Sequence, residues 1–256
     1  MSRIVSIHSF RGGTGKSNLT ANLAATVAQR GHRVGIVDTD IQSPGIHILF
    51  GLDEERITRA LNDYLWGRCP IDEAAYDVTT VLPPSNGTTA TRPAIFLIPS
   101  SLKAGEIARV LREGYDVSLL NDGFQDVIRS LALDFLFIDT HPGVNEETLL
   151  SIAISDALAI VLRPDSQDYQ GTAVTVELAR QLEVPRLLMV VNKVLPAMDF
   201  SAVQRKVEDA YGVRVAGVLP LSEDMVHLGS SGLFCLRFPD HAFARVVRTV
   251  ADQIVA

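Results

Sequence analysis

The segment at residues 8–17, HSFRGGTGKS, constrains the fold of this chain more than any other segment. It follows a short apolar run at 4–7 and precedes a stretch in which apolar residues recur at helical spacing. Glycines let successive backbone N–H groups curve around an anion, and the start of a helix presents the positive end of its dipole to that anion. The segment therefore predicts a strand, a phosphate-binding loop and a helix, in that order.

Two side chains at the end of this loop extend its chemistry. Lys16 supplies a mobile positive charge for the β- and γ-phosphates of a nucleotide, and Ser17 offers a hydroxyl ligand to Mg²⁺. A glycine-rich turn with an exposed lysine is the simpler interpretation, but it leaves the agreement of strand, loop, Lys-Ser pair and helix unexplained. The remaining phosphate contacts are expected from the backbone of Gly12, Gly13, Thr14, Gly15 and Asn18.

Further apolar runs follow, and most of them are continuous rather than alternating, as in strands buried on both faces. They lie at 34–37, 95–98, 135–138, 158–162, 187–191 and 213–218. Helical patterns separate most of them, for example at 165–182 and 199–211. This order predicts one α/β domain over residues 1–256, with a mostly parallel, twisted sheet of seven or eight strands and helices on both faces.

The segment at 39–93 is harder to interpret. Residues 57–66 have a helical pattern, and 79–93 is rich in Thr, Pro, Ser and Gly. The second stretch is either a functional loop or a loose hairpin that leads into the strand at 95–98.

Composition narrows the class of protein. The net charge of −7 opposes a general nucleic-acid-binding surface. The two cysteines, Cys69 and Cys235, form no CxxC pair, so neither a structural zinc site nor an iron–sulfur site is expected. No apolar run reaches the length of a membrane span, and no signal-peptide pattern is visible, so we expect a cytoplasmic protein.

The phosphate loop departs from the common pattern GxxxxGK[ST], because Phe10 stands where that pattern has glycine. It resembles the deviant Walker A loop of the MinD/ParA family, xKGGxGK[ST]. Four later segments resemble segments of that family, in the same order: 34–40 (VGIVDTD), 135–143 (FLFIDTHPG), 187–193 (LLMVVNK) and 217–221 (GVLPL). The resemblance implies a single-domain, Mg²⁺-dependent ATP hydrolase that forms a homodimer on binding ATP.

The resemblance also implies roles for individual residues beyond the loop. Asp40 would orient or activate the attacking water, while Asp38 and Asp139 would lie near Mg²⁺ at the ends of two strands. Asn192 would face the edge of the adenine base, and Pro220 would lie against it. Capping and turn roles stay open as alternatives for these five residues.

Arg11 is the main departure from the family pattern. The family has a signature lysine at this position, which reaches across the dimer to the phosphates of the partner. Arginine is also cationic and binds phosphate through a planar fork. We therefore expect Arg11 to bind the nucleotide of the partner and to take part in catalysis. Lys103 is a weaker candidate for this role.

Several branches of the wider family are disfavoured, since its iron–sulfur scaffolds and targeting factors use CxxC. The branch that positions cell-division machinery, chromosomes, plasmids or other cargo remains, with a protein activator or cargo adaptor as partner. DNA contact through Arg245 and Arg248 stays open, although the net charge opposes it. The apolar stripe of the last helix, within 243–254, is expected to dock on the core rather than on a membrane.

Two other functions stay open. The first is a nucleotide-binding scaffold with negligible turnover, which uses bound ATP only to hold the shape that a protein partner recognises. The second, less favoured, is an ATP-dependent synthetase, for which no acceptor substrate is evident.

Overall fold

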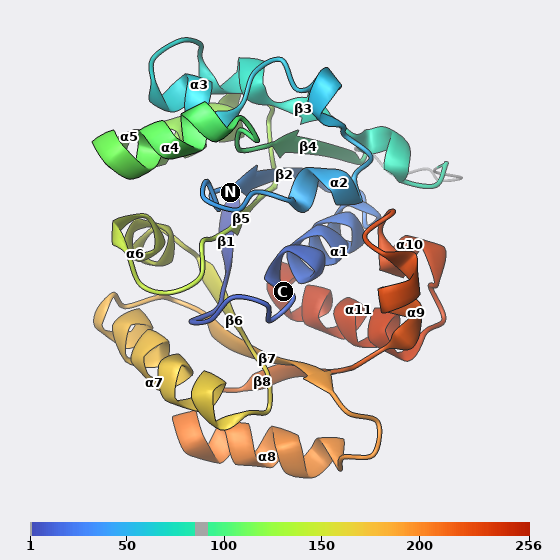
Figure 1. Ribbon diagram of the computed structural model, residues 1–256. Coiled ribbons are helices and arrows are strands. Elements are labelled where there is room, and N and C mark those ends of the chain that lie inside the picture. Colours follow the sequence, from blue (N-terminus) through green and yellow to red (C-terminus); the bar gives the residue numbers. More distant parts are fainter. Residues whose placement is uncertain (1, 85–91) are drawn as a thin grey trace.

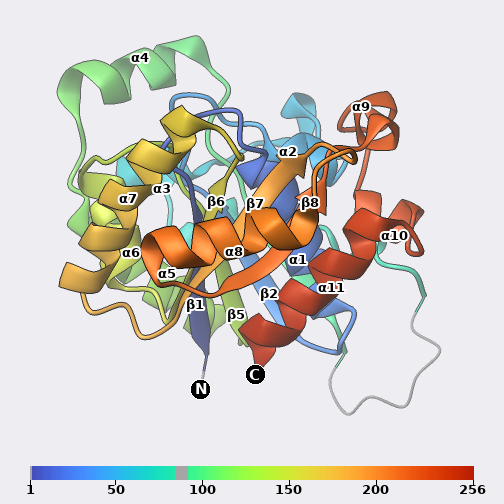
Figure 2. The same ribbon diagram turned by 90° about the horizontal axis from the view of Figure 1, so that it is seen from below.

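One eight-stranded sheet forms the centre of the molecule (Figures 1 and 2). This computed structural model describes residues 2–84 and 92–256, so part of the stretch at 79–93 lies outside the described residues. The order across the sheet is β3-β4-β2-β5-β1-β6-β7-β8, with β3 antiparallel to β4 and the other described pairs parallel. The strands are β1 (Arg3–His8), β2 (Arg33–Asp38), β3 (Tyr76–Asp77), β4 (Ala94–Ile98), β5 (Phe135–Asp139), β6 (Ala157–Leu162), β7 (Leu187–Val194) and β8 (Val215–Pro220). The predicted mostly parallel sheet of seven or eight strands is confirmed.

Helices connect most of the parallel strands. The α-helices are α1 (Lys16–Ala28), α2 (Ile46–Leu49), α3 (Leu61–Leu65), α4 (Ala104–Glu113), α5 (Ser118–Ser130), α6 (Glu146–Ala153), α7 (Ser166–Gln181), α8 (Phe200–Tyr211), α9 (Glu223–Leu228), α10 (Phe234–Arg237) and α11 (Ala242–Val255). Three short 3-10 helices are η1 (Glu54–Arg56), η2 (Ile71–Ala74) and η3 (Thr79–Val81).

The helices cover both faces of the sheet, as the continuous apolar runs require (Figure 1). Successive residues of a strand point to opposite faces, so Val5 and Ile7 of β1 pack with α1 and α11, whereas Ile4 packs with α5. On this second face α3 and α5 cover the half around β2, and α6, α7 and α8 cover the half around β6 and β7.

The last helix, α11, docks on the core. Its residues Phe243, Val247, Val250 and Ile254 are buried, so the expectation that this apolar stripe faces the core is correct. The approach to β8 is close: a Cβ at Gly217 would lie 2.6 Å from Val246 and 2.8 Å from Val250. Within the described part of the chain, no helix has the length and apolar character needed to cross a bilayer.

The region before β4 differs from expectation. The helical pattern at 57–66 yields only the short helix α3, because the Asp63 carboxylate accepts a hydrogen bond from the Ala60 N–H at 3.0 Å and caps the helix there. Consecutive strands β3 and β4 pair antiparallel, as a hairpin would, but residues 85–91 of their connection are outside the described residues.

Candidate nucleotide-binding site

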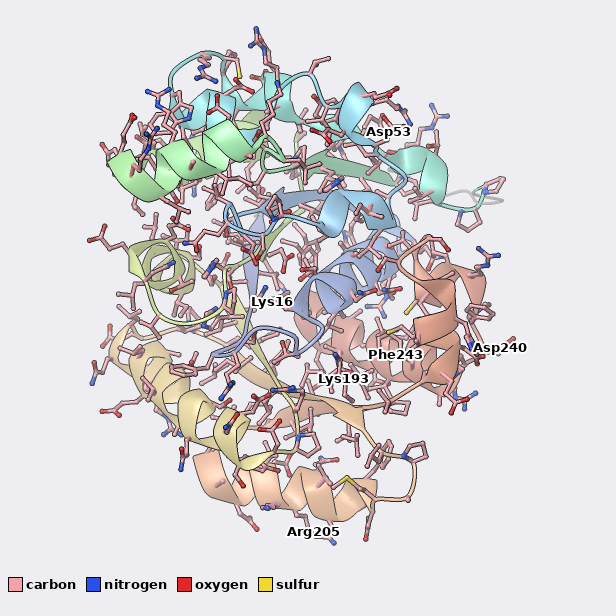
Figure 3. The ribbon with its side chains drawn as sticks, in the orientation of Figure 1. Lys16, Asp53, Lys193, Arg205, Asp240 and Phe243 are labelled. Carbon is pink, nitrogen blue, oxygen red and sulfur yellow. The ribbon has the colours of Figure 1, made fainter. Side chains whose placement is uncertain are left out.

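Three neighbouring strands bring the predicted site residues to one edge of the sheet. In the pairing of β1 with β5, Ile7 lies beside Asp139, and in the pairing of β2 with β5, Asp38 lies beside Asp139. Figure 3 shows Lys16 at this edge, near the middle of the molecule. The carboxyl ends of parallel strands are where open α/β sheets bind ligands, so the sheet itself assembles the site.

The phosphate loop encloses a cavity of about 240 Å³. Most of the loop residues predicted to bind nucleotide line it, together with Asp40 of the loop that follows β2. The lining residues are Ser9, Gly12, Gly13, Thr14, Gly15, Lys16, Ser17, Asn18, Asp40, Ser43 and Pro142. Arg11, Asp38, Asp139, Asn192 and Pro220 are not among them.

The backbone of the loop is shaped for an anion. Gly13 and Gly15 have positive φ angles of 76° and 90°, which residues with a Cβ rarely adopt. A Cβ at Gly15 would also lie only 2.6 Å from the Asn192 Nδ2. The helix α1 begins at Lys16 without a side-chain cap, so its first N–H groups are available to a phosphate.

Asn192 and Lys193, at the end of β7, hold the loop from the side. Asn192 Nδ2 donates to the Thr14 carbonyl at 2.8 Å, and Lys193 Nζ donates to the Gly13 carbonyl at 2.8 Å. Lys193 adopts a positive φ of 58° to do so, and Figure 3 shows it beside the loop. These bonds fix two loop carbonyls, which leaves the loop N–H groups to face the cavity. Asn192 thus contacts the loop directly, in addition to the contact with adenine that the resemblance implies.

Lys16 and Asp139 form a buried ion pair at the start of α1. Lys16 Nζ lies 3.5 Å from Asp139 Oδ1, and both side chains are almost fully buried. The Thr20 hydroxyl lies 3.3 Å from the same oxygen. Burial raises the pKa of Asp139, although the charge of Lys16 and a hydrogen bond from Ser17 oppose that rise.

The donor set around Asp139 fits Mg²⁺. Asp139 Oδ2 is buried and has no hydrogen-bond partner among the described residues, and Ser17, which lines the cavity, lowers the pKa of this carboxylate. A carboxylate and a hydroxyl are hard oxygen ligands, and Mg²⁺ is commonly held by one or two protein ligands together with phosphates. Within residues 2–84 and 92–256, no cluster of three or more His, Cys, Asp or Glu offers a complete metal site.

Asp38, which was expected to lie near Mg²⁺, does not line the cavity. It is fully buried, and its two oxygens accept hydrogen bonds from the N–H groups of Asp40 at 3.0 Å and Gly45 at 3.2 Å. Burial and the neighbouring carboxylates of Asp139 and Asp40 raise its pKa well above the usual range. In this structure Asp38 shapes the loop that carries Asp40.

Asp40 reaches the cavity from that loop. Its Oδ1 accepts hydrogen bonds from the N–H and the hydroxyl of Ser43, at 3.1 and 3.0 Å, and lies 3.8 Å from His141 Nε2. Its Oδ2 has no hydrogen bond to the described residues. The carboxylate is therefore held by one oxygen, while the other remains available for a water molecule.

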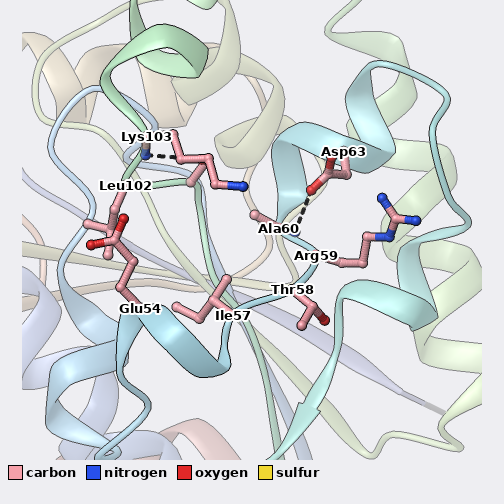
Figure 4. A pocket seen from close by; sticks show the side chains of 9 residues that line it. Glu54, Ile57, Thr58, Arg59, Ala60, Asp63, Leu102 and Lys103 are labelled. Carbon is pink, nitrogen blue, oxygen red and sulfur yellow. Dashed lines mark hydrogen bonds between the residues drawn. The ribbon is translucent and has the colours of Figure 1, made fainter.

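The remaining predicted residues lie at the border of the site or outside it. Arg11 is 44% exposed, and its Nε lies 4.0 Å from Asp168 Oδ1 of α7. Pro220 ends β8, where it pairs with Val194. Lys103, the weaker candidate for the role of Arg11, lines a separate hollow with Glu54 and Asp63 (Figure 4).

Sequence reasoning missed Lys193, Ser43 and the contact between His141 and Asp40. A signal existed for the first two, since Lys193 directly follows Asn192 and Ser43 stands three residues after Asp40, the spacing of a local Asp–Ser turn. For His141 no local signal existed, because the pairing of β2 with β5 is what brings it near Asp40.

Comparison with known proteins adds independent evidence. A family model described as ParA: NUBPL iron-transfer P-loop NTPase matches residues 1–255. An uncharacterised ATP-binding protein of Methanocaldococcus jannaschii is 24% identical over 258 residues, which cover 100% of this chain and 88% of that protein. An iron–sulfur cluster carrier protein of Methanococcus maripaludis is 31% identical over 214 residues, which cover 81% of this chain and 65% of that protein.

Solved structures share the fold. The cell division ATPase MinD of Pyrococcus furiosus aligns with a TM-score of 0.81 at 21% identity, covering 100% of this chain and 99% of that one. The septum site-determining protein MinD of Pyrococcus horikoshii, complexed with Mg-ADP, aligns with a TM-score of 0.80 at 19% identity, covering 99% and 96%. Since the family model spans nearly the whole sequence and these structures share its fold, the chain belongs to the MinD/ParA family of P-loop NTPases.

Proposed function

We propose that this protein is a Mg²⁺-dependent ATP hydrolase that works as an ATP-driven dimerisation switch in the positioning or partitioning of an intracellular cargo. The observation that carries the proposal is that Asp40 lines the same cavity as the phosphate loop. A carboxylate there faces the place where the γ-phosphate of a bound nucleotide would be attacked. Such an arrangement serves hydrolysis as well as binding.

The residues divide the chemistry as follows. Lys16 and the N–H groups of the loop bind the phosphates, and Asp40 orients the attacking water through its free oxygen. Ser17 and Asp139 would hold Mg²⁺, which would supply positive charge to neutralise the phosphates. Lys16 is released from its pair with Asp139 when phosphate arrives, because the phosphates carry more negative charge than one carboxylate.

ATP joins two protomers face to face, so that the exposed Arg11 of one protomer contacts the phosphates of the other. Hydrolysis releases the dimer and, with it, the cargo. A sharp switch of this kind requires that ATP favour the dimer by several kcal/mol more than ADP does. A protein activator or cargo adaptor then sets the hydrolysis rate, which is low without it.

Carriage of an iron–sulfur cluster, the role in the name of one relative, fits this chain poorly. Cluster ligands are thiolates, and burial raises the pKa of the Cys235 thiol to about 12. Cys235 lies in α10, on the face that α1 covers, whereas Cys69 follows α3 on the other face. The two cysteines of one protomer therefore do not make a paired site.

Phosphate release and molecular mass in solution test the proposal. We expect slow ATP hydrolysis by the wild type, none by Asp40→Ala, and a dimer of Asp40→Ala that persists with ATP. Lys16→Ala should lose both binding and dimerisation. A wild-type rate equal to that of Asp40→Ala, even with candidate partners added, would favour a nucleotide-binding scaffold instead.

Arg11→Ala tests the contact between protomers. The substitution should leave ATP bound to the monomer but abolish the ATP-dependent dimer, measured by light scattering with ATP and with ADP. Arg205→Ala, at an exposed position of α8, is the matched control. An Arg11→Ala protein that dimerises as the wild type does would overturn the role of Arg11.

A further inference from the structure

Residues 10 and 11 of the phosphate loop lie against the first two turns of α7. The ring of Phe10 occupies the space beside Gly171, where a Cβ would come within 2.0 Å of Phe10 Cδ1. The next residue, Arg11, places its Nε 4.0 Å from Asp168 Oδ1. Asp168 and Gly171 are three residues apart, so they share one face of the helix. The loop is therefore docked on α7 at two adjacent points.

Asp168 is a fixed, ionised carboxylate. It is 2% exposed, and it accepts hydrogen bonds from the N–H of Arg163 at 2.8 Å and from its guanidinium at 3.0 Å on both oxygens. Burial alone would raise the pKa of Asp168, but the hydrogen bonds from Arg163 hold it below its usual value. Asp168 is therefore held in one conformation, whereas the half-exposed side chain of Arg11 is free to change its conformation beside Asp168.

The contact uses only one edge of the Arg11 guanidinium. Nε lies at ion-pair distance from Asp168, 4.0 Å from Oδ1, and the guanidinium makes no hydrogen bond to the described residues. A guanidinium can be held at Nε while its terminal amino groups bind phosphate, because its donors are spread over a rigid plane. The single ammonium of a lysine has no such second edge. This gives a physical reason for arginine at position 11, where the family pattern has lysine.

We propose that Asp168 is a positioning residue that orients the guanidinium of Arg11 toward the ATP phosphates of the partner protomer. This inference rests on the proposed function, in which Arg11 acts between protomers. Asp168 is buried and both of its oxygens are bonded by Arg163, so its effect on hydrolysis passes through Arg11.

A double-mutant cycle of ATP hydrolysis and dimerisation tests this role. Asp168→Asn should lower kcat about tenfold and leave KM for ATP nearly unchanged, because a misplaced group costs mainly transition-state stabilisation. In the Arg11→Lys background, which is expected to keep a measurable rate, the same substitution should change little further. An equal loss in both backgrounds would show that Asp168 only braces the start of α7, and would overturn the proposal.

Arg11→Lys supplies a second test, which leaves the packing of Asp168 intact. It should lower kcat about as much as Asp168→Asn does. Full activity with lysine would show that position 11 does not need a guanidinium that contacts Asp168 and phosphate at the same time. Full activity of Asp168→Asn, alongside an Arg11→Ala protein that has lost its dimer, would overturn this inference and leave the proposed function standing. A wild type that neither hydrolyses ATP nor dimerises would overturn both.

Discussion

His8, the last residue of β1, is a fully buried histidine whose protonation the hydrogen-bond network defines. The Thr140 hydroxyl donates its proton to the Ile7 carbonyl at 3.0 Å, so its oxygen must accept from His8 Nδ1, 2.7 Å away. His8 Nε2 is buried without a hydrogen-bond partner in the described part of the chain. Burial, and then the nearby charges of Lys16 and His141, lower the pKa of His8 from 6.5 to about 3.

This shift predicts a loss of stability in acid. Between pH 6.5 and about 3 the unfolded chain protonates His8 while the folded chain does not, so the contribution of His8 is present above pH 6.5 and declines as the pH falls. In His8→Asn, the free energy of unfolding in urea should fall less steeply from pH 7 to 5, by up to about 1.4 kcal/mol per pH unit.

The slope, rather than the stability at one pH, is the quantity to compare, because the asparagine itself has a cost that does not depend on pH. His227→Asn, which removes an exposed histidine from α9, is the matched control. Parallel curves for the wild type and His8→Asn would show that the pKa of His8 is the same in the folded and the unfolded chain.

At the scale of single residues, the sequence predicted which residues come together better than how their hydrogen bonds arrange them. The residues 12–18 and Asp40 line one cavity, which the motif alone suggested. The hydrogen bonds of Asp38 to the following loop and the contact of Lys193 with the loop depend on backbone conformations that no short motif encodes. Their roles toward nucleotide remain predictions.

At the scale of elements, the contact between the phosphate loop and α7 depends on the missing side chain of Gly171. A glycine inside a helix normally costs about 1 kcal/mol relative to alanine. Gly171→Ala should nevertheless destabilise the protein by about 1–3 kcal/mol, because its Cβ must displace the Phe10 ring and overpack the contact. Urea unfolding measures the difference.

Gly105→Ala in α4 is the matched substitution, since nothing lies within 4 Å of a Cβ there. It should stabilise the protein by up to about 1 kcal/mol, as expected of an open helical site. Phe10→Ala should restore stability to Gly171→Ala by vacating the space. If Gly171→Ala stabilised as Gly105→Ala does, the packing of Phe10 on α7 would not hold in solution.

The elements that could be predicted are those with wide apolar faces. The strands and helices α1, α7, α8 and α11 bury several residues each and follow the expected patterns. Helices α4, α5 and α6 were not among the predicted patterns, and α4 buries only Val110 of its residues. The pattern at 57–66 predicted too long a helix. The Asp63 carboxylate caps the N-terminus, so the helix begins at Leu61.

At the scale of the whole molecule, the sequence predicted a parallel sheet but not the order of its strands. That order places β1 between β5 and β6, strands more than 120 residues away in the sequence. Pairing between such distant strands depends on which helices pack on each face of the sheet. No local sequence pattern contains this information. Yet it is this order that joins the phosphate loop, Asp40 and Asp139.

The same long-range packing brings the two ends of the chain side by side (Figures 1 and 2). Arg3 of β1 donates to the carbonyls of Ile254 at 3.1 Å and Val255 at 2.8 Å, and Arg186 donates to the Gln253 carbonyl at 2.7 Å. The last carbonyls of a helix have no partner within it. Arg3 of β1 and Arg186, which directly precedes β7, therefore satisfy the end of α11.

Arg3 makes both of its bonds through Nη1, and Arg186 also bonds through Nη1, so methionine keeps the apolar stem of each side chain and removes the donors. Arg3→Met and Arg186→Met should each lower the free energy of unfolding by about 0.5–1.5 kcal/mol, the usual net value of a hydrogen bond. Both should also speed amide hydrogen exchange in the last turn of α11, while exchange in α1 changes little.

Arg205→Met is the comparison that separates this effect from loss of charge. Figure 3 shows Arg205 at the outer edge of α8, where it makes no hydrogen bond or ion pair with the described residues, so its substitution should change stability by less than about 0.5 kcal/mol. If Arg3→Met and Arg186→Met matched Arg205→Met in stability and exchange, the end of α11 would be held by its apolar face alone. A selective loss at α11 would instead assign these two arginines to holding the last turn of α11 against the sheet.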